Sequence, residues 1–382
     1  MEKRSFKTTE KKISLLGFGT MRLPVINTET QEIDLPQAEE MFDNALKNGV
    51  NYFDTAFPYH NGMSETVVGN ILANYPRDSF YLADKMPIWD VQSPDDVAKI
   101  FQKQLEKCRV DYFDFYLLHN ISLRKMPKIE AMKAYEYLAE QKKSGKIRQL
   151  GFSFHDSSDA LKNIVNRYDW DFAQIQLNYL DWELLDAQGQ YNILTEHELP
   201  IAIMEPIRGG ALATLCPEAI AILKEADPEK SPASWALRYA ASLPNVYTVL
   251  SGMSNLEQLA DNIQTFHHFQ PLTSAEQNVL SKALDAYRKA SPIPCTACRY
   301  CMDCPNGVDI PKNFAIYNRY LTTSNIIEFI SSYIVLEESK RAKHCVECGL
   351  CQEKCPQKLN IPELMPKIDN AFQKIEKPQW FA

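Results

Sequence analysis

Several features that mark other classes of protein are absent from this sequence. No stretch reaches the roughly 18 consecutive apolar residues that a membrane-spanning helix needs, so we expect no membrane partner. The N-terminal segment MEKRSFKTTEKK has no apolar core of the kind found in secretory signals, and we therefore expect a cytoplasmic protein. The net charge is −8 and no basic stripe offsets it, so binding to nucleic acid is not expected.

Cysteine is nearly missing from the first three quarters of the chain. Only two of the ten cysteines precede residue 295, and the other eight lie between Cys295 and Cys355. A chain of 382 residues also exceeds the usual size of a single hydrophobic core. The shift in composition therefore predicts a first domain, a linker that contains the rigid SPIP sequence, and a second domain, over residues 1–284, 285–294 and 295–382.

Short apolar runs alternate with amphipathic stretches along the first domain, and most runs are continuous, which is typical of strands buried on both faces. The eight runs are 13–21, 51–56, 79–85, 113–119, 147–153, 172–177, 200–206 and 246–252. Helical patterns cover 35–49, 64–73, 93–108, 128–143, 157–166 and 255–266. This alternation predicts an α/β protein with a (β/α)8 TIM barrel. An open doubly wound sheet is the rival, but its Gly-x-Gly-x-x-Gly fingerprint is missing.

Four polar side chains stand at or just beyond the ends of three neighbouring runs: Asp54, Tyr59, Lys85 and His119. Active sites of such barrels are built at the C-terminal ends of the strands, so we expect the four at one mouth. An ammonium beside a phenol lowers its pKa, and a buried ammonium needs a counter-ion. The set predicts Tyr59 as an acid for a carbonyl, Lys85 and Asp54 as its supporting pair, and His119 as a donor to the carbonyl oxygen. A plain buried ion pair with a structural Tyr and His is the alternative.

The C-terminal cysteines form two runs. They are Cys295, Cys298, Cys301 and Cys304, and Cys345, Cys348, Cys351 and Cys355. The second run has the C-x2-C-x2-C-x3-C-P spacing of bacterial cluster-binding proteins, and the first has one residue fewer before its last cysteine. In two-cluster proteins the fourth cysteine of a run binds the other cluster. We therefore predict two [4Fe–4S] clusters, one on Cys295, Cys298, Cys301 and Cys355 and one on Cys345, Cys348, Cys351 and Cys304. A zinc ribbon is the alternative.

The segments YFDTAFPYHNGMSE, LADK and FYLLHN resemble the catalytic segments of the aldo-keto reductases. LGFGTMRL resembles the first strand of that family, SETVVGNIL its second helix, and the resemblance extends over about residues 12–268. It implies that NADP(H) or NAD(H) binds without a Rossmann domain, that a small aldehyde or ketone is reduced, and that the four polar residues form the catalytic tetrad. Residues 310–343 are expected to be helical, and the whole chain resembles family members that carry a C-terminal, ferredoxin-type iron–sulfur domain.

The resemblance also implies which residues contact the cofactor. They are Gly19, Thr20, Met21, Asp54, Ser153, Gln174, Met204, Gln258 and Asn262. Gly252 and Gln258 stand where the family usually has the Lys and Arg that hold the adenosine 2′-phosphate. We therefore expect no preference for NADP over NAD.

Two functions are compatible with these features. The first is a nicotinamide-dependent oxidoreductase that reduces a carbonyl by direct hydride transfer with Tyr59 as the general acid. The alternative is a cofactor-sensing regulatory subunit or an electron-transfer subunit, with little carbonyl turnover, that meets a redox partner protein. No flavin-binding motif is recognisable, so we expect hydride transfer not to need the clusters.

Overall fold

The computed structural model of the chain describes residues 1–6, 12–27, 30–290 and 292–375. Its contacts define two compact units. The first unit consists of Met1–Pro206 and Ala236–Leu272, and the second consists of Ile207–Trp235 and Thr273–Ala382. The segment 207–235 thus groups with the second unit, although it lies inside the predicted first domain. Ser291 of the predicted linker lies outside the described residues. The domain limits therefore stay predictions.

Eight parallel strands of the first unit close into a barrel, which confirms the predicted fold class. In barrel order they are β10 (Phe172–Gln176), β11 (Ile201–Met204), β12 (Val246–Gly252), β3 (Leu16–Gly19), β6 (Tyr52–Asp54), β7 (Tyr81–Met86), β8 (Phe113–Ile121) and β9 (Ile147–Phe154). The strands are buried along almost their whole length because they face the barrel interior on one side and helices on the other. This order places β6, β7 and β8 side by side, and these strands carry Asp54, Lys85 and His119.

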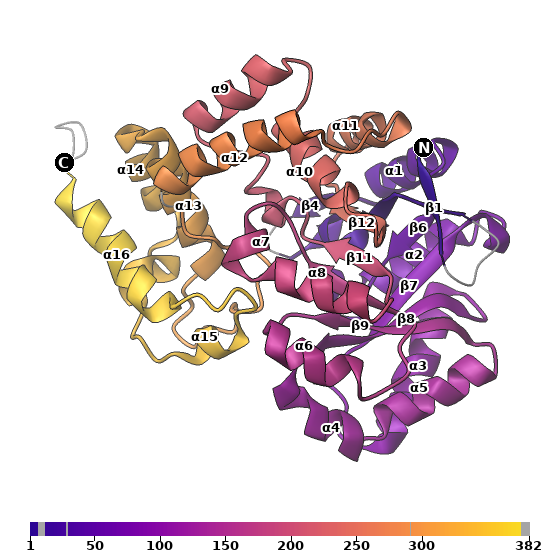
Figure 1. Cartoon of the computed structure of the whole chain (residues 1–382). Helices are drawn as coiled ribbons and strands as arrows, with labels where there is room; N and C mark the ends of the chain where they lie inside the picture. The colour runs from indigo at the N-terminus through magenta and orange to yellow at the C-terminus, as the bar shows by residue number, and fades with distance from the viewer. Residues whose placement is uncertain (7–11, 28–29, 291, 376–382) are drawn as a thin grey trace. The chain divides into compact units, whose positions relative to one another are not determined.

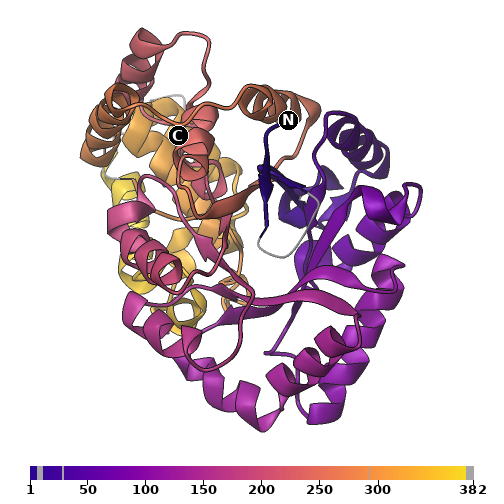
Figure 2. The same ribbon diagram turned by 45° about the vertical axis from the view of Figure 1, so that its right-hand side comes forward.

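Helices follow the strands around the outside of the barrel (Figures 1 and 2). They are α1 (Leu35–Lys47), α2 (Ser64–Leu72), α3 (Pro94–Cys108), α4 (Met126–Ala131), α5 (Ala134–Lys143), α6 (Ser158–Val165), α7 (Asp181–Leu184), α8 (Ala187–Glu196) and α11 (Leu256–His267), together with α10 (Pro232–Ala241), of which residues from Ala236 onward belong to the first unit. Short 3-10 turns are η1 (Thr20–Arg22), η2 (Tyr59–Gly62), η3 (Arg77–Ser79) and η4 (Leu123–Lys125). Ser93 and Asp96 form a capping box at the start of α3. The single helix predicted over 128–143 is instead α4 and α5, because Lys133 between them has a φ of 50°.

Two small antiparallel hairpins accompany the barrel: β1 (Lys3–Ser5) with β2 (Lys12–Ser14), and β4 (Val25–Asn27) with β5 (Glu32–Ile33). The run predicted as one strand over 13–21 is therefore two strands, because β2 pairs with β1 and only β3 joins the barrel. After β1, the ring of Phe6 lies 5.2 Å from Phe115 and 5.0 Å from Tyr247. Phe6 thus packs against the aromatic side chains that fill the barrel interior.

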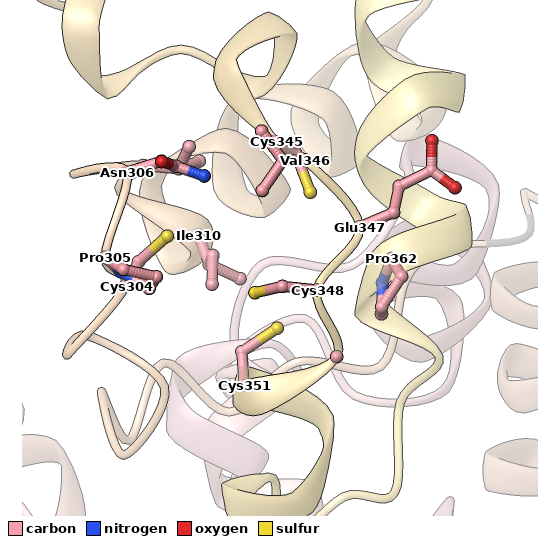
Figure 3. Close-up of a pocket in the computed structure, with 12 residues that line it drawn as sticks. Cys304, Pro305, Asn306, Ile310, Cys345, Val346, Glu347, Cys348, Cys351 and Pro362 are labelled. Carbon is pink, nitrogen blue, oxygen red and sulfur yellow. The ribbon is translucent and has the colours of Figure 1, made fainter.

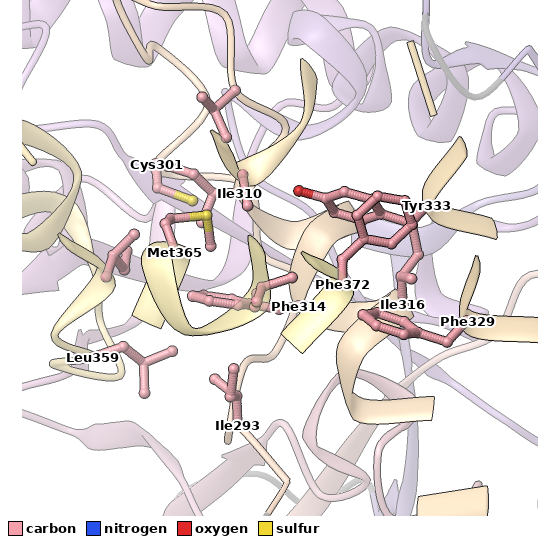
Figure 4. Packing of buried hydrophobic residues seen from close by; sticks show 14 of the residues in the cluster. Ile293, Cys301, Ile310, Phe314, Ile316, Phe329, Tyr333, Leu359, Met365 and Phe372 are labelled. Atoms are coloured by element: carbon pink, nitrogen blue, oxygen red, sulfur yellow. The ribbon is translucent and has the colours of Figure 1, made fainter. Parts of the chain in front are cut away.

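The second unit is helical. Its helices are α9 (Pro217–Ala226), α12 (Ser274–Lys289), α13 (Ile310–Thr323), α14 (Ile326–Val335), α15 (Leu350–Lys354) and α16 (Ile361–Lys374), with turns η5 (Arg208–Gly210), η6 (Glu338–Lys340) and η7 (Ala342–His344). Phe314, Phe329, Tyr333 and Phe372 form much of its apolar core (Figure 4). No strand occurs in the described part of this unit, so the C-terminal part of the chain is helical, as predicted. Among the described residues, no helix is both long and apolar enough to cross a membrane.

Candidate functional site

A buried ion pair joins two neighbouring strands at the mouth of the barrel. The Lys85 Nζ donates to Asp54 Oδ1 at 2.6 Å and to the Thr55 carbonyl at 2.8 Å. The side chains of Lys85 and Asp54 are only 1% and 4% exposed. Asp54 ends β6, and Lys85 lies near the end of β7, so parallel pairing of these strands brings the two groups together. Burial raises the pKa of Asp54, and the Lys85 ammonium opposes that rise.

Tyr59 lies on the turn η2 that follows β6. The Lys85 Nζ is 3.4 Å from the Tyr59 Oη, so the ammonium reaches both the carboxylate and the phenol. The turn holds this position because His60 and Asn61 adopt left-handed conformations, with φ of 50° and 53°. Burial raises the pKa of Tyr59 well above its ordinary value, and the Asp54 carboxylate adds to that rise. The net pKa shift is therefore opposite to the one expected from the Lys85 ammonium, because burial and the carboxylates of Asp54, Glu205 and Asp84 raise the pKa.

His119 completes the group from β8. Its ring centroid lies 6.3 Å from that of Tyr59 and 4.9 Å from that of Trp89. Burial lowers the pKa of His119 well below its ordinary value, and the nearby Lys85, His155 and Lys125 charges lower it further. His119 is therefore neutral at neutral pH, and a neutral imidazole has one N–H to donate. Among the described residues, His119 Nδ1 is buried and has no hydrogen-bond partner.

These contacts give the mouth of the barrel a phenol that keeps its proton, an ammonium within reach of it, and a neutral imidazole. Such a group can deliver a proton to an oxygen atom and stabilise the negative charge that the oxygen develops. The structure brings all four predicted catalytic residues together.

Several predicted cofactor residues lie near Asp54. Gln174 donates from Nε2 to Asp54 Oδ2 at 3.1 Å, and Thr20 donates to the Asp54 carbonyl at 3.0 Å. Ser153 lies beside Gln174 in the strand register, and its Oγ accepts from the Asn120 N–H at 2.7 Å. Gln174 Oε1 is buried without a hydrogen-bond partner among the described residues. An acceptor left open at this depth fits an amide N–H donor such as that of a nicotinamide carboxamide.

The remaining predicted cofactor residues lie at the ends of β3 and β11, in η1 and on α11. Gly19 ends β3, Met21 is half-buried in η1, and Met204 is half-buried at the end of β11. Exposed Gln258 accepts from the Ser254 N–H at 2.8 Å. Asn262 is buried and donates to Ser251 Oγ at 2.9 Å.

The structure also shows neighbours of the tetrad that the sequence did not single out. Trp89 follows β7 and packs on His119, and the Lys125 Nζ lies 5.6 Å from the centre of the Trp89 ring. Burial lowers the pKa of Lys125 to about 8. Burial lowers the pKa of His155 to about 4. Position was the signal that could have identified them, because Trp89, Lys125 and His155 lie in the segments that follow β7, β8 and β9.

The cysteines of the second unit gather in two pockets. One is lined by Cys295, Cys298, Cys301 and Cys355. The other is lined by Cys304, Cys345, Cys348 and Cys351, whose sulfurs turn toward a common space (Figure 3). Each pocket thus combines three cysteines of one run with the last cysteine of the other, as the crossed ligand sets require. Among the described residues, no three potential ligands converge on one point as a single metal ion demands. In a [4Fe–4S] cluster each thiolate binds its own iron, so the residues present fit such a group.

Comparison with known proteins agrees with this arrangement. The model of the Aldo/keto reductase family matches residues 15–285, and that of the 4Fe-4S dicluster domain matches residues 294–361. The chain therefore belongs to the aldo/keto reductase family of oxidoreductases and carries a 4Fe-4S dicluster domain at its C-terminal end.

Relatives and solved structures cover the barrel. The chain is 29% identical over 290 residues to the uncharacterized oxidoreductase YqkF of Bacillus subtilis, covering 69% of this chain and 90% of that protein. It is 30% identical over 283 residues to an aldo-keto reductase of Mycolicibacterium smegmatis, covering 72% and 91%. Aldo-keto reductase AKR11C1 from Bacillus halodurans, in its holo form, superposes with a TM-score of 0.61 at 26% identity, covering 74% and 96%.

Proposed function

We propose that the barrel reduces a small aldehyde or ketone, using NADH or NADPH as the hydride source and Tyr59 as the general acid. The observation that carries this proposal is the position of the Lys85 Nζ, 2.6 Å from Asp54 Oδ1 and 3.4 Å from Tyr59 Oη at the mouth of the barrel. A structural ion pair would not need a phenol and a neutral imidazole beside it.

Each residue has a defined part in the proposed reaction. A bound reduced nicotinamide supplies hydride to the carbonyl carbon. Tyr59 donates its hydroxyl proton to the carbonyl oxygen, and the Lys85 ammonium stabilises the phenolate that is left. Asp54 holds that ammonium in place through the hydrogen bond at 2.6 Å and serves as the counter-ion that a buried cation needs. His119 donates a hydrogen bond that orients the carbonyl oxygen toward Tyr59.

The cofactor is held, in this proposal, by the groups around Asp54. Gln174 Oε1 accepts from the carboxamide, and Gly19, Thr20, Met21, Ser153 and Met204 line the same site. Asn262 and Gln258 lie at the adenosine end, where neither carries a charge. That end therefore offers little discrimination between NAD and NADP.

The second unit, in this proposal, binds two [4Fe–4S] clusters through the crossed cysteine sets. The support is the pair of cysteine-lined pockets together with the dicluster match. Thiolates in such numbers persist in a reducing compartment, which supports a cytoplasmic location in this proposal. The clusters either brace the second unit or exchange electrons with a redox partner protein.

Substitution of Tyr59 by Phe tests the assignment of the acid. We expect Tyr59→Phe to lower kcat for reduction of an uncharged aldehyde by about 10²- to 10⁴-fold, because a general acid contributes that much. Cofactor affinity, measured by fluorescence titration, should not change. The matched control is Tyr52→Phe, because that phenol bonds to Tyr247 among the barrel-filling side chains and should be silent in catalysis. Retention of most of kcat in Tyr59→Phe refutes the assigned role.

A second function has specific support. The dicluster match and the exposed Cys348 suit an electron-transfer or cofactor-sensing subunit with little carbonyl turnover. Purified protein that binds nicotinamide, reduces no carbonyl in a broad panel, and is reduced at its clusters by a one-electron protein donor would support this alternative.

A further inference from the structure

An arginine in the segment after β11 forms hydrogen bonds with residues next to the cysteines of the first pocket. Arg208, the first residue of η5, is only 1% exposed. Its Nη2 donates to the Pro294 carbonyl at 2.7 Å and to Gln357 Oε1 at 2.9 Å. Pro294 immediately precedes Cys295, and Gln357 lies two residues after Cys355. The guanidinium is therefore tied to both segments that supply the first cysteine set, Cys295, Cys298, Cys301 and Cys355.

The backbone of the same turn packs closely against the first cysteine run. Gly209 has a φ of 63°, and a Cβ added there would lie 2.2 Å from the Thr296 carbonyl oxygen. Thr296 is buried and stands between Cys295 and Cys298. This approach, possible only for glycine, fixes Arg208 at one position relative to the cysteines.

The two cysteine pockets differ in their surrounding charge. Burial lowers the pKa of Arg208 to about 10, so the guanidinium stays charged at neutral pH, and Cys295 and Cys355 are among the groups that act on it. Arg208 reaches the first pocket through Gln357, which lines it, whereas Arg299 lines the pocket directly but has a side chain that is 44% exposed and lies 3.8 Å from Asp309. The second pocket is lined by Glu347 and, among its described lining residues, by no Arg or Lys.

We propose that Arg208 raises the reduction potential of the cluster held by Cys295, Cys298, Cys301 and Cys355, and leaves the other cluster nearly unaffected. The proposal rests on the cluster assignment made above. Reduction adds one electron from an external one-electron donor and breaks no bond, so the cluster with its four thiolates becomes more negative. A fixed, buried cation stabilises that reduced state more than the oxidised state, and the low local dielectric keeps the effect strong.

The test is a potentiometric titration of the full chain with both clusters loaded, with dithionite as the donor and EPR as the readout. At the potential where half of the first cluster is reduced in the wild type, Arg208→Met should lower its ratio of reduced to oxidised cluster about tenfold, which is ~59 mV for one electron. Arg208→Lys, which keeps the charge but loses the planar fork, should stay within about threefold of the wild type. Arg299→Met is the matched control, because it removes the same charge from an exposed position and should change the ratio less than twofold.

The Cys298→Ser variant assigns each transition in the titration to one cluster, because it perturbs the EPR signal of the first cluster alone. The proposal is overturned if Arg208→Met moves neither potential, moves both equally, or is matched by Arg208→Lys. Should the Met variant lose iron, Arg208→Gln keeps a donor for Gln357, and a potential equal to the wild type again overturns the proposal. Failure of the wild type to show two cluster signals refutes the cluster assignment instead. None of these outcomes depends on the rate of carbonyl reduction.

Discussion

Replacement of Lys85 by Met removes the buried ion pair at the mouth of the barrel and so measures its contribution to stability. The substitution keeps the length of the side chain but leaves the Asp54 carboxylate, 4% exposed, without the ammonium at 2.6 Å. Removing one partner of a buried pair costs about 3–5 kcal/mol. At roughly 2–4 °C per kcal/mol for a domain of this size class, the Tm of the barrel should fall by roughly 6–20 °C.

The loss should also depend on pH in a defined direction. Without Lys85, the pKa of Asp54, already raised by burial, rises further. A raised pKa in the folded state favours the protonated, folded form at acidic pH, and this stability is lost as the pH rises through that pKa. The variant should therefore lose more stability, relative to the wild type, at pH 8 than at pH 5.

Thermal unfolding of the full chain, followed by circular dichroism and separately by cluster absorbance, measures this loss. The two probes are needed because the two units need not unfold together. The double variant Asp54→Asn/Lys85→Met should recover much of the lost Tm, because no unpaired charge stays buried. The matched control is Lys47→Met, which breaks the exposed pair with Asp43 and should change the Tm little. A Lys85→Met variant no less stable than Lys47→Met, or a double variant no more stable than Lys85→Met, refutes the reasoning.

Three further predictions concern the cofactor, the clusters and pH. Because Gly252 and Gln258 supply no cation, titration of the two cofactors at equal ionic strength should show less than about a hundredfold preference, ~2.7 kcal/mol, and a thousandfold preference for NADPH contradicts this. Cys348→Ser should loosen the second unit, as shown by iron content and proteolysis, while the barrel still binds nicotinamide and keeps its anaerobic single-turnover rate. A collapse of that rate would place the clusters on the reaction path. With an uncharged aldehyde, kcat/KM should be flat from about pH 6 to 9, because the raised pKa of Tyr59 keeps it protonated and the lowered pKa of His119 keeps it neutral. An ionisation of the tetrad inside that range contradicts the assigned protonation states.

The sequence predicted most of the barrel because its strands are buried on both faces and leave continuous apolar runs. The prediction from sequence failed where the limits of a strand depend on which neighbouring strand it pairs with. Residues 13–21 look like one strand, yet β2 and β3 separate because each has a different neighbour. The break between α4 and α5 lies at Lys133, a residue with no helix-breaking character of its own.

The candidate site was predictable where motif and topology coincide. Asp54, Lys85 and His119 come together because β6, β7 and β8 are neighbours in the barrel. The pKa of Tyr59 was predicted in the wrong direction, because the depth of burial cannot be read from spacing. The contact of Arg208 with Gln357 joins residues 149 positions apart and leaves no periodic signal in the sequence.

The central claim is that hydride passes directly from the nicotinamide to the carbonyl carbon, with Tyr59 supplying the proton. The most direct measurement uses cofactor labelled with deuterium at either face of the nicotinamide C4, anaerobic protein with intact clusters, and mass spectrometry of the alcohol product. One of the two labelled cofactors should place a single deuterium on the carbinol carbon, in H2O and with Cys348→Ser as well as wild type. Product whose carbinol hydrogen comes from solvent with both labelled cofactors would contradict direct transfer.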